Sequence, residues 1–208
     1  MGKDNNLMDD KNKVSERIND FLKLDNFDLS IEYLRTIHSF LFDGIYESAA
    51  RFRNSNVKKR EVILNGDSVN YSDCRVMFQD LFKCMISQYN LKYQEMDKES
   101  VVKNISLFTA MLWKCHPFDD GNTRTVSVYI QKYLRSLGYN VDNEIFKDNC
   151  LYFRNALVKA NYSNPEFYIK SDISSLEKFF RKVLIDNKIE LDINEVYLDD
   201  IVKIGRGR

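Results

Sequence analysis

The sequence has little proline, glycine or cysteine, and neither sign of charge is in excess. Two prolines and seven glycines in 208 residues leave no long structureless linker to expect. Lysine plus arginine equals aspartate plus glutamate at 31 each, which argues against a broad nucleic-acid-binding surface. Cys74, Cys84, Cys115 and Cys150 form no CxxC pair, so the spacing predicts reduced thiols rather than a zinc site or a disulfide framework.

Long apolar runs are also missing. No stretch approaches the roughly 20 apolar residues that a membrane-spanning helix needs. The first residues, MGKDNNLMDDKNK, are polar and predict no secretory signal. We therefore expect a cytoplasmic protein without a membrane or nucleic-acid partner. The one basic cluster, Lys58-Lys59-Arg60, is short, and we interpret it as a solvated loop.

The residues that are abundant indicate a helical domain. Apolar residues make up 44% and charged residues 30% of the chain, which is typical of a globular protein of one domain. Apolar residues recur at helical spacing, and serines at 30 and 72 are candidate N-caps. The sequence predicts an all-α fold after a frayed polar start, with helices near 14–24, 31–41, 73–86, 98–114, 123–137, 146–160 and 173–186.

One segment has a different pattern. Between Arg60 and Tyr71, three apolar residues precede Asn65-Gly66. After this pair, apolar and polar residues alternate, with Val69 and Tyr71 apolar. Asn-Gly between apolar residues is a strong hairpin signal because both positions accept a positive φ. We expect one small β-hairpin here.

The segment most informative about function is His116-Pro117-Phe118-Asp119-Asp120-Gly121-Asn122-Thr123-Arg124, between two predicted helices. The first backbone N–H groups of the second helix have no partner within the helix and, with its dipole, favour an anion. Gly121 permits close approach of the backbone, and Arg124 can bind phosphate oxygens with its fork of donors. This end of the loop predicts a phosphate cradle.

Two further side chains beside the cradle are candidates for metal binding and for proton transfer. Asp120 offers the hard oxygen ligand that Mg²⁺ prefers. An ordinary histidine such as His116 titrates near neutrality and can accept a proton from an attacking hydroxyl. Phe118 is expected to anchor the loop in the core. Base, metal ligand and cradle within nine residues indicate phosphoryl or nucleotidyl transfer.

Each of these residues alone has a simpler explanation, such as helix capping, a solvated turn or surface charge. Only the ordered set favours a catalytic loop. A Cys115–His116 nucleophile pair is the less favoured alternative, because adjacent residues rarely present both side chains to one point. His38, among apolar neighbours in a helix, is interpreted as structural.

The segment HPFDDGNTR resembles the signature of Fic-domain proteins, H-x-F-x-(D/E)-G-N-G-R-x-x-R. The matching positions are His116, Phe118, Asp120, Gly121, Asn122 and Arg124. Together with the predicted hairpin and the helical stretch before it, the resemblance covers roughly residues 30–165. It implies a compact helical bundle with a β-hairpin flap near the active-site loop. We expect an N-terminal helical extension at 1–29, a Fic domain at 30–190 and a tail at 191–208.

The resemblance also implies an activity. Many Fic enzymes transfer AMP from ATP to a serine, threonine or tyrosine hydroxyl of a target protein. By this analogy His116 is the general base, Asp120 holds Mg²⁺, and the cradle binds the phosphates of ATP through Gly121, Asn122, Thr123 and Arg124. The flap, with Glu61, Val62, Ile63 and Leu64, would dock the target segment by strand addition.

Two positions depart from the signature. Thr123 replaces the second glycine, and Ser127 stands where the final arginine falls. The inhibitory pattern (S/T)-x-x-x-E-(G/N) of self-inhibited relatives has no match in the chain. These departures leave open an unrestrained enzyme, a separate antitoxin-like inhibitory partner, or another control. They also leave open the transfer of another nucleotide or of phosphate, and a weakened module that binds nucleotide or protein. A homo-oligomer is a separate possibility that the sequence leaves open.

Overall fold

The computed structural model describes residues 2–197, with side chains from residue 8 onward. Within this part of the chain the fold is all-α, as the sequence predicts, and contains no β-strand beyond an isolated bridge between Asn164 and Ile169. The helices are α1 (Gly2–Lys23), α2 (Ile31–Phe42), α3 (Met77–Tyr89), α4 (Lys98–Cys115), α5 (Asn122–Ser136), α6 (Asn143–Asp148), α7 (Cys150–Asn161) and α8 (Ser174–Leu184).

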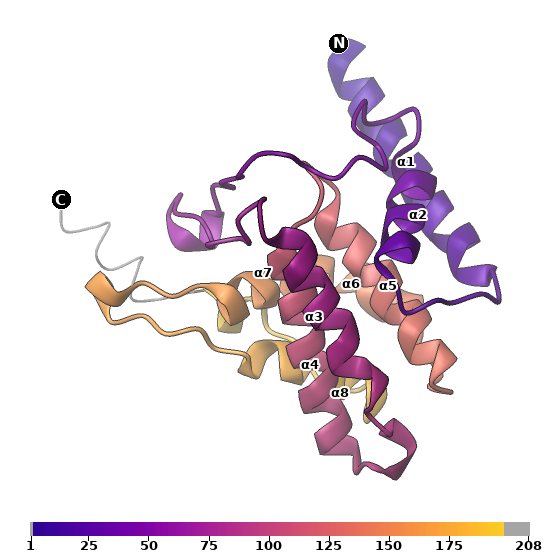
Figure 1. Cartoon of the computed structure of the whole chain (residues 1–208), viewed down its shortest axis with the longest axis vertical. Coiled ribbons are helices and arrows are strands. Elements are labelled where there is room, and N and C mark those ends of the chain that lie inside the picture. Colours follow the sequence, from indigo (N-terminus) through magenta and orange to yellow (C-terminus); the bar gives the residue numbers. More distant parts are fainter. Residues whose placement is uncertain (1, 198–208) are drawn as a thin grey trace.

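Helix α4 is the centre of the bundle and packs against α3, α5, α7 and α8 (Figure 1). Its apolar stripe is buried as expected, with Val102, Ile105 and Leu112 fully enclosed. Helices α1 and α2 form a second layer that packs on α5. Because α4 and α5 both belong to the core, the loop that joins them is held at both ends.

The N-terminal helix is longer than predicted, since α1 begins at Gly2 where we expected a frayed end. A narrow stripe that includes the buried Val14 and Phe21 joins it to the core. Arg17 donates to the Leu41 and Asp43 carbonyls at the end of α2, at 3.1 and 2.8 Å. These contacts stabilise α1 from Val14 onward.

The chain reverses direction at Asn65-Gly66, as predicted, but the predicted β-strands on either side of the turn do not form. Residues Val62–Leu64 form a 3₁₀ turn, and Asn65 and Gly66 follow with positive φ. The Glu61 N–H donates to the Asp67 carbonyl at 2.9 Å, but the pairing does not extend into a ladder. The short turn bonds within itself, from the Leu64 N–H to the Glu61 carbonyl at 3.1 Å, and so leaves no paired strands.

Other boundaries also differ from the sequence pattern. Helix α3 begins at Met77 rather than after Ser72, whose N–H instead donates to the Lys114 carbonyl. The expected 146–160 helix is divided at Asn149 into α6 and α7. The expected tail, 191–208, contains a 3₁₀ turn, Ile193–Val196, that buries Val196, and residues 198–208 lie outside the described part of the chain. No helix in residues 2–197 is both long and apolar enough to cross a membrane.

Candidate active site

The loop between α4 and α5 is set by two positive φ angles. His116, the residue after the end of α4, has φ 46°, and Gly121, the residue before the start of α5, has φ 76°. A β-carbon at Gly121 would lie 2.5 Å from Cε2 of Phe42, so both the backbone angle and the available space require glycine. The Thr125 N–H bonds the Gly121 carbonyl at 3.0 Å and starts the helix.

The interior of the loop is closed by reciprocal hydrogen bonds. Asn122 accepts from the Phe118 N–H at 3.0 Å and donates to the Phe118 carbonyl at 2.7 Å. Phe118 is buried as predicted and stacks on His38, with ring centroids 3.8 Å apart. Asn122 therefore shapes the loop through its side chain, in addition to offering its backbone N–H.

His38 has the structural role that the sequence predicts. Its Nδ1 accepts from the Ala50 N–H at 3.0 Å, so its Nε2 carries the proton and donates to the Asp120 carbonyl, also at 3.0 Å. Burial lowers the pKa of His38, which favours this neutral form. The ring thereby connects α2 to the centre of the loop.

Arg53 is a second organiser of the loop and was not singled out from the sequence. Its buried guanidinium donates to the His116 carbonyl at 2.6 Å, the Cys115 carbonyl at 3.2 Å and the Ser55 carbonyl at 2.7 Å. It also bonds the Ser72 carbonyl, and its own N–H donates to the Pro117 carbonyl at 2.9 Å. One side chain thus fixes the backbone at the end of α4, but nothing local in the sequence indicates that role.

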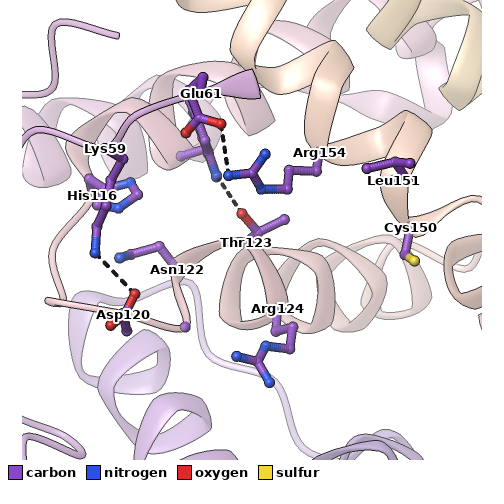
Figure 2. A pocket seen from close by; sticks show the side chains of 12 residues that line it. Lys59, Glu61, His116, Asp120, Asn122, Thr123, Arg124, Cys150, Leu151 and Arg154 are labelled. Atoms are coloured by element: carbon purple, nitrogen blue, oxygen red, sulfur yellow. Dashed lines mark hydrogen bonds and ion pairs between the residues drawn. The ribbon is translucent and has the colours of Figure 1, made fainter. Parts of the chain in front are cut away.

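A cavity of about 420 Å³ opens above the start of α5. The figure shows the side chains that surround it (Figure 2). The loop residues predicted as base, metal ligand and phosphate cradle all contribute to its wall, and residues from α4, from the segment at 59–61 and from α7 complete it. The lining residues are Lys59, Glu61, Trp113, His116, Asp120, Gly121, Asn122, Thr123, Arg124, Cys150, Leu151 and Arg154.

His116 is in an unusual electrostatic environment. The ring is buried, lies 4.0 Å from the Tyr71 ring, and has no hydrogen-bond partner for Nδ1 within the described chain. Burial, then the positive charges of Lys59 and Arg53, lowers the pKa of His116 to about 3. The sequence predicts a histidine that titrates near neutrality, but the lowered pKa of His116 keeps its ring neutral at pH 7.

Thr123 adapts to the position where the signature has glycine. It lies inside α5, so the positive φ belongs to Gly121 and the Thr123 β-carbon imposes no strain there. Its hydroxyl accepts from the indole N–H of Trp113 at 2.9 Å. Thr123 also lines the cavity, together with Asn122 and Arg124 of the same helical turn.

Arg124 is held beside the cradle by aromatic residues of the α2 end. Its guanidinium lies 4.7 Å from the centre of the Phe42 ring and donates to the Tyr46 hydroxyl at 2.6 Å. These contacts orient a cation next to the first turn of α5. Ser127, one turn further, lines a neighbouring cavity of about 250 Å³ that shares Thr123 and Arg124 with the first.

Asp120 carries the carboxylate that the sequence assigned to a metal. Its side chain is 68% exposed and accepts from Lys59 Nζ at 3.0 Å. Among the side chains described, residues 8–197, no cluster of three histidine, cysteine, aspartate or glutamate residues could hold a metal ion. A single accessible carboxylate beside the first turn of α5 fits the few protein ligands that Mg²⁺ takes, since this ion draws most of its ligands from phosphates and water.

Lys59 corrects our interpretation of the basic cluster as solvated loop. Lys59 Nζ donates to the Asp119 carbonyl at 2.6 Å as well as to Asp120, and the side chain lines the cavity. The sequence places Lys59 far from the loop, so its contact could not be read from local pattern.

The predicted docking residues occupy several environments. Glu61 is buried and pairs with Arg154 of α7 at 2.7 Å, while Ile63 and Leu64 point into the core. Val62 is 84% exposed. Glu61 and Arg154 therefore join the turn to α7 above the cavity, and Arg154 is a lining residue that sequence reasoning missed.

The environment of Cys115 is not that of a nucleophilic cysteine. Its sulfur lies 3.9 Å from that of Cys84, and its thiol donates to the Met111 carbonyl at 3.3 Å. The contact with Cys84, and then burial, raises the pKa of the Cys115 thiol. This environment disfavours the Cys115–His116 pair.

Comparisons with known proteins agree with this fold. The model of the Fic/DOC family matches residues 28–134, just over half of the chain, and the protein therefore belongs to the Fic/DOC family. A crystal structure of BepC, a VirB-translocated effector protein of Bartonella tribocorum with bound AMPPNP, has the same fold at a TM-score of 0.66. It is 16% identical, with 88% of each chain covered.

Two curated relatives carry names that state an activity. A probable protein adenylyltransferase of Sinorhizobium fredii, y4lH, is 29% identical over 120 residues, which are 55% of this chain. The protein adenylyltransferase VbhT of Bartonella schoenbuchensis is 22% identical over 179 residues, or 84% of this chain. The aligned regions span 57% and 34% of the two relatives.

Proposed function

We propose that this protein is a nucleotidyltransferase that moves AMP from ATP to a serine, threonine or tyrosine hydroxyl of a protein, with His116 as general base. The observation that supports this most strongly is that a buried, neutral His116 lines the same cavity as the first residues of α5, whose backbone N–H groups lack partners within the helix. A proton acceptor and an anion cradle in one cavity suit attack by a hydroxyl on a bound phosphate. The names of the two relatives agree with this reaction.

In the proposed reaction, the target hydroxyl oxygen bonds to the α-phosphorus of ATP as its proton passes to His116. The bond from the α-phosphorus to the oxygen that bridges to the β-phosphate breaks, and pyrophosphate leaves. The N–H groups of Asn122 and Thr123, with Arg124, hold the phosphates. Bound phosphates bring negative charge near His116, which raises its pKa and strengthens it as a base.

Asp120 is the residue that would hold Mg²⁺, which would neutralise charge on the phosphates. The turn at residues 61–64 would meet the target segment through its exposed Val62, because Ile63 and Leu64 are buried. We also propose that residues 30–190 form the Fic domain and that 1–29 and 191–208 flank it. Helix α1 nevertheless shares the core of that domain.

Intact-mass spectrometry after incubation with ATP and Mg²⁺ tests the reaction, with the protein itself and a cell lysate as acceptors. We expect a gain of about 329 Da per AMP in the wild type and none in His116→Ala. A gain of about 80 Da would show phosphate transfer instead. Binding of ATP without any labelling of protein or lysate would favour a nucleotide-binding module.

A further inference from the structure

Lys59 contacts the candidate metal ligand from a distant part of the sequence. Its Nζ lies 3.0 Å from Asp120 Oδ1 and 2.6 Å from the Asp119 carbonyl oxygen (Figure 2). A carboxylate and a carbonyl are the hard oxygen donors that a divalent cation takes. The ammonium therefore lies where a cation bound to Asp120 would be.

The contact can open at low cost. The side chain of Lys59 is 32% exposed and that of Asp120 is 68% exposed, so solvent screens their attraction. The backbone of Lys59 is fixed separately, since its N–H donates to the Ser68 hydroxyl at 3.1 Å. The side chain can thus leave Asp120 while the segment stays in place.

A divalent cation on Asp120 would repel the ammonium. Lys59 lines the same cavity as the first turn of α5, where the proposed function places the phosphates of the donor. Once displaced from Asp120, the ammonium of Lys59 would have the donor phosphates as anionic partners in the same cavity.

We propose that Lys59 takes the place of the divalent cation on Asp120 in the nucleotide-free protein, and transfers to the donor phosphates when cation and nucleotide bind. Lys59 is therefore a positioning residue for the donor. This inference rests on the proposed function, because it requires a polyphosphate at the start of α5.

The inference predicts opposite shifts in two affinities. Without Lys59 a divalent cation meets no competitor on Asp120 and binds more tightly. The nucleotide loses a cationic partner and binds more weakly. A purely structural role would weaken both, and a solvated surface lysine would change neither. Lys58, the exposed neighbour, provides a matched control.

The test compares the wild type with Lys59→Met and Lys58→Met. Free Mn²⁺ measured by electron paramagnetic resonance gives the cation affinity without nucleotide, and calorimetry with a non-hydrolysable ATP analogue at saturating Mn²⁺ gives the nucleotide affinity. We expect Lys59→Met to bind Mn²⁺ about threefold more tightly and the analogue about tenfold more weakly, with Lys58→Met unchanged.

Parallel weakening of both affinities in Lys59→Met, or no change in either, would overturn the inference while leaving the proposed function intact. A wild type that binds no ATP analogue would overturn the proposed function, and this inference with it.

Discussion

The indole N–H of Trp113 donates a hydrogen bond to the hydroxyl of Thr123 at 2.9 Å. Trp113 is buried in α4 and Thr123 is in the first turn of α5, so the bond joins the two helices on either side of the candidate catalytic loop. The position where the family signature has glycine thus has a defined partner in this chain.

Removing the Thr123 hydroxyl should destabilise the protein. Thr123→Val keeps the shape of the side chain but leaves the Trp113 N–H without its acceptor, at a cost of about 1–3 kcal/mol. Urea unfolding should show this loss, and Thr123→Ser, which keeps the hydroxyl, should retain most of the stability. Equal loss in both variants would mean that the bond contributes little.

Gly121→Ala should disable the site. The new β-carbon would meet Phe42 at 2.5 Å, and alanine would have to adopt φ 76°. The backbone angle alone costs about 1–2 kcal/mol. Gly66→Ala is the matched control, because it has φ 89° but nothing within 4 Å of its β-carbon. We expect Gly121→Ala to lose more stability than the control and to lose nucleotide binding. Equal losses in the two variants would contradict the steric argument.

Acid should destabilise the protein through His116. Its pKa is lowered to about 3 in the folded state, whereas an unfolded histidine titrates near 6.5. The stability that the neutral, buried His116 ring contributes is therefore fully present above pH 6.5. It is lost as the pH falls, because between pH 6.5 and 3 the histidine gains a proton only in the unfolded chain. At pH 5 the loss is about 2 kcal/mol relative to pH 8.

Urea unfolding of the wild type and His116→Gln at both pH values measures this contribution. The variant keeps His38, so the difference between the two proteins isolates His116. The pH dependence of His116→Gln should be smaller by about the same 2 kcal/mol. An unchanged pH dependence would show that His116 titrates normally in the folded protein.

Arg53→Lys should uncouple the catalytic loop from the preceding segment. The guanidinium bonds carbonyls of Ser55, Ser72, Cys115 and His116, and an ammonium with three donors cannot reach them all. We expect a loss of about 2–3 kcal/mol in unfolding free energy and a fall in AMP transfer. Arg51→Lys, on an exposed residue of the same segment, should change neither quantity. Full activity in Arg53→Lys would show that the loop holds its shape without this side chain.

Local pattern was sufficient to predict that most of the helices exist and that α4 and α5 flank the candidate catalytic loop, although not every helix boundary. The stripe of α4 is buried as expected, Ser30 caps α2 with a bond to the Tyr33 N–H at 3.1 Å, and the chain reverses at Asn65-Gly66. It failed at the hairpin strands, because strand formation requires a pairing partner and the turn bonds within itself instead. It also failed at the start of α1, which begins at Gly2 rather than near Val14.

The sequence by itself determined the family resemblance, the all-helical class and the order of the candidate base, carboxylate and cradle residues in the loop, because these depend on residues close together in the chain. Only the tertiary structure decided the environment of those residues. The lowered pKa of His116, the contact of Lys59 with Asp120, the Arg53 bonds and the Glu61–Arg154 pair all come from segments distant in sequence. Burial and charge at a site depend on everything packed around it, and no local spacing specifies them.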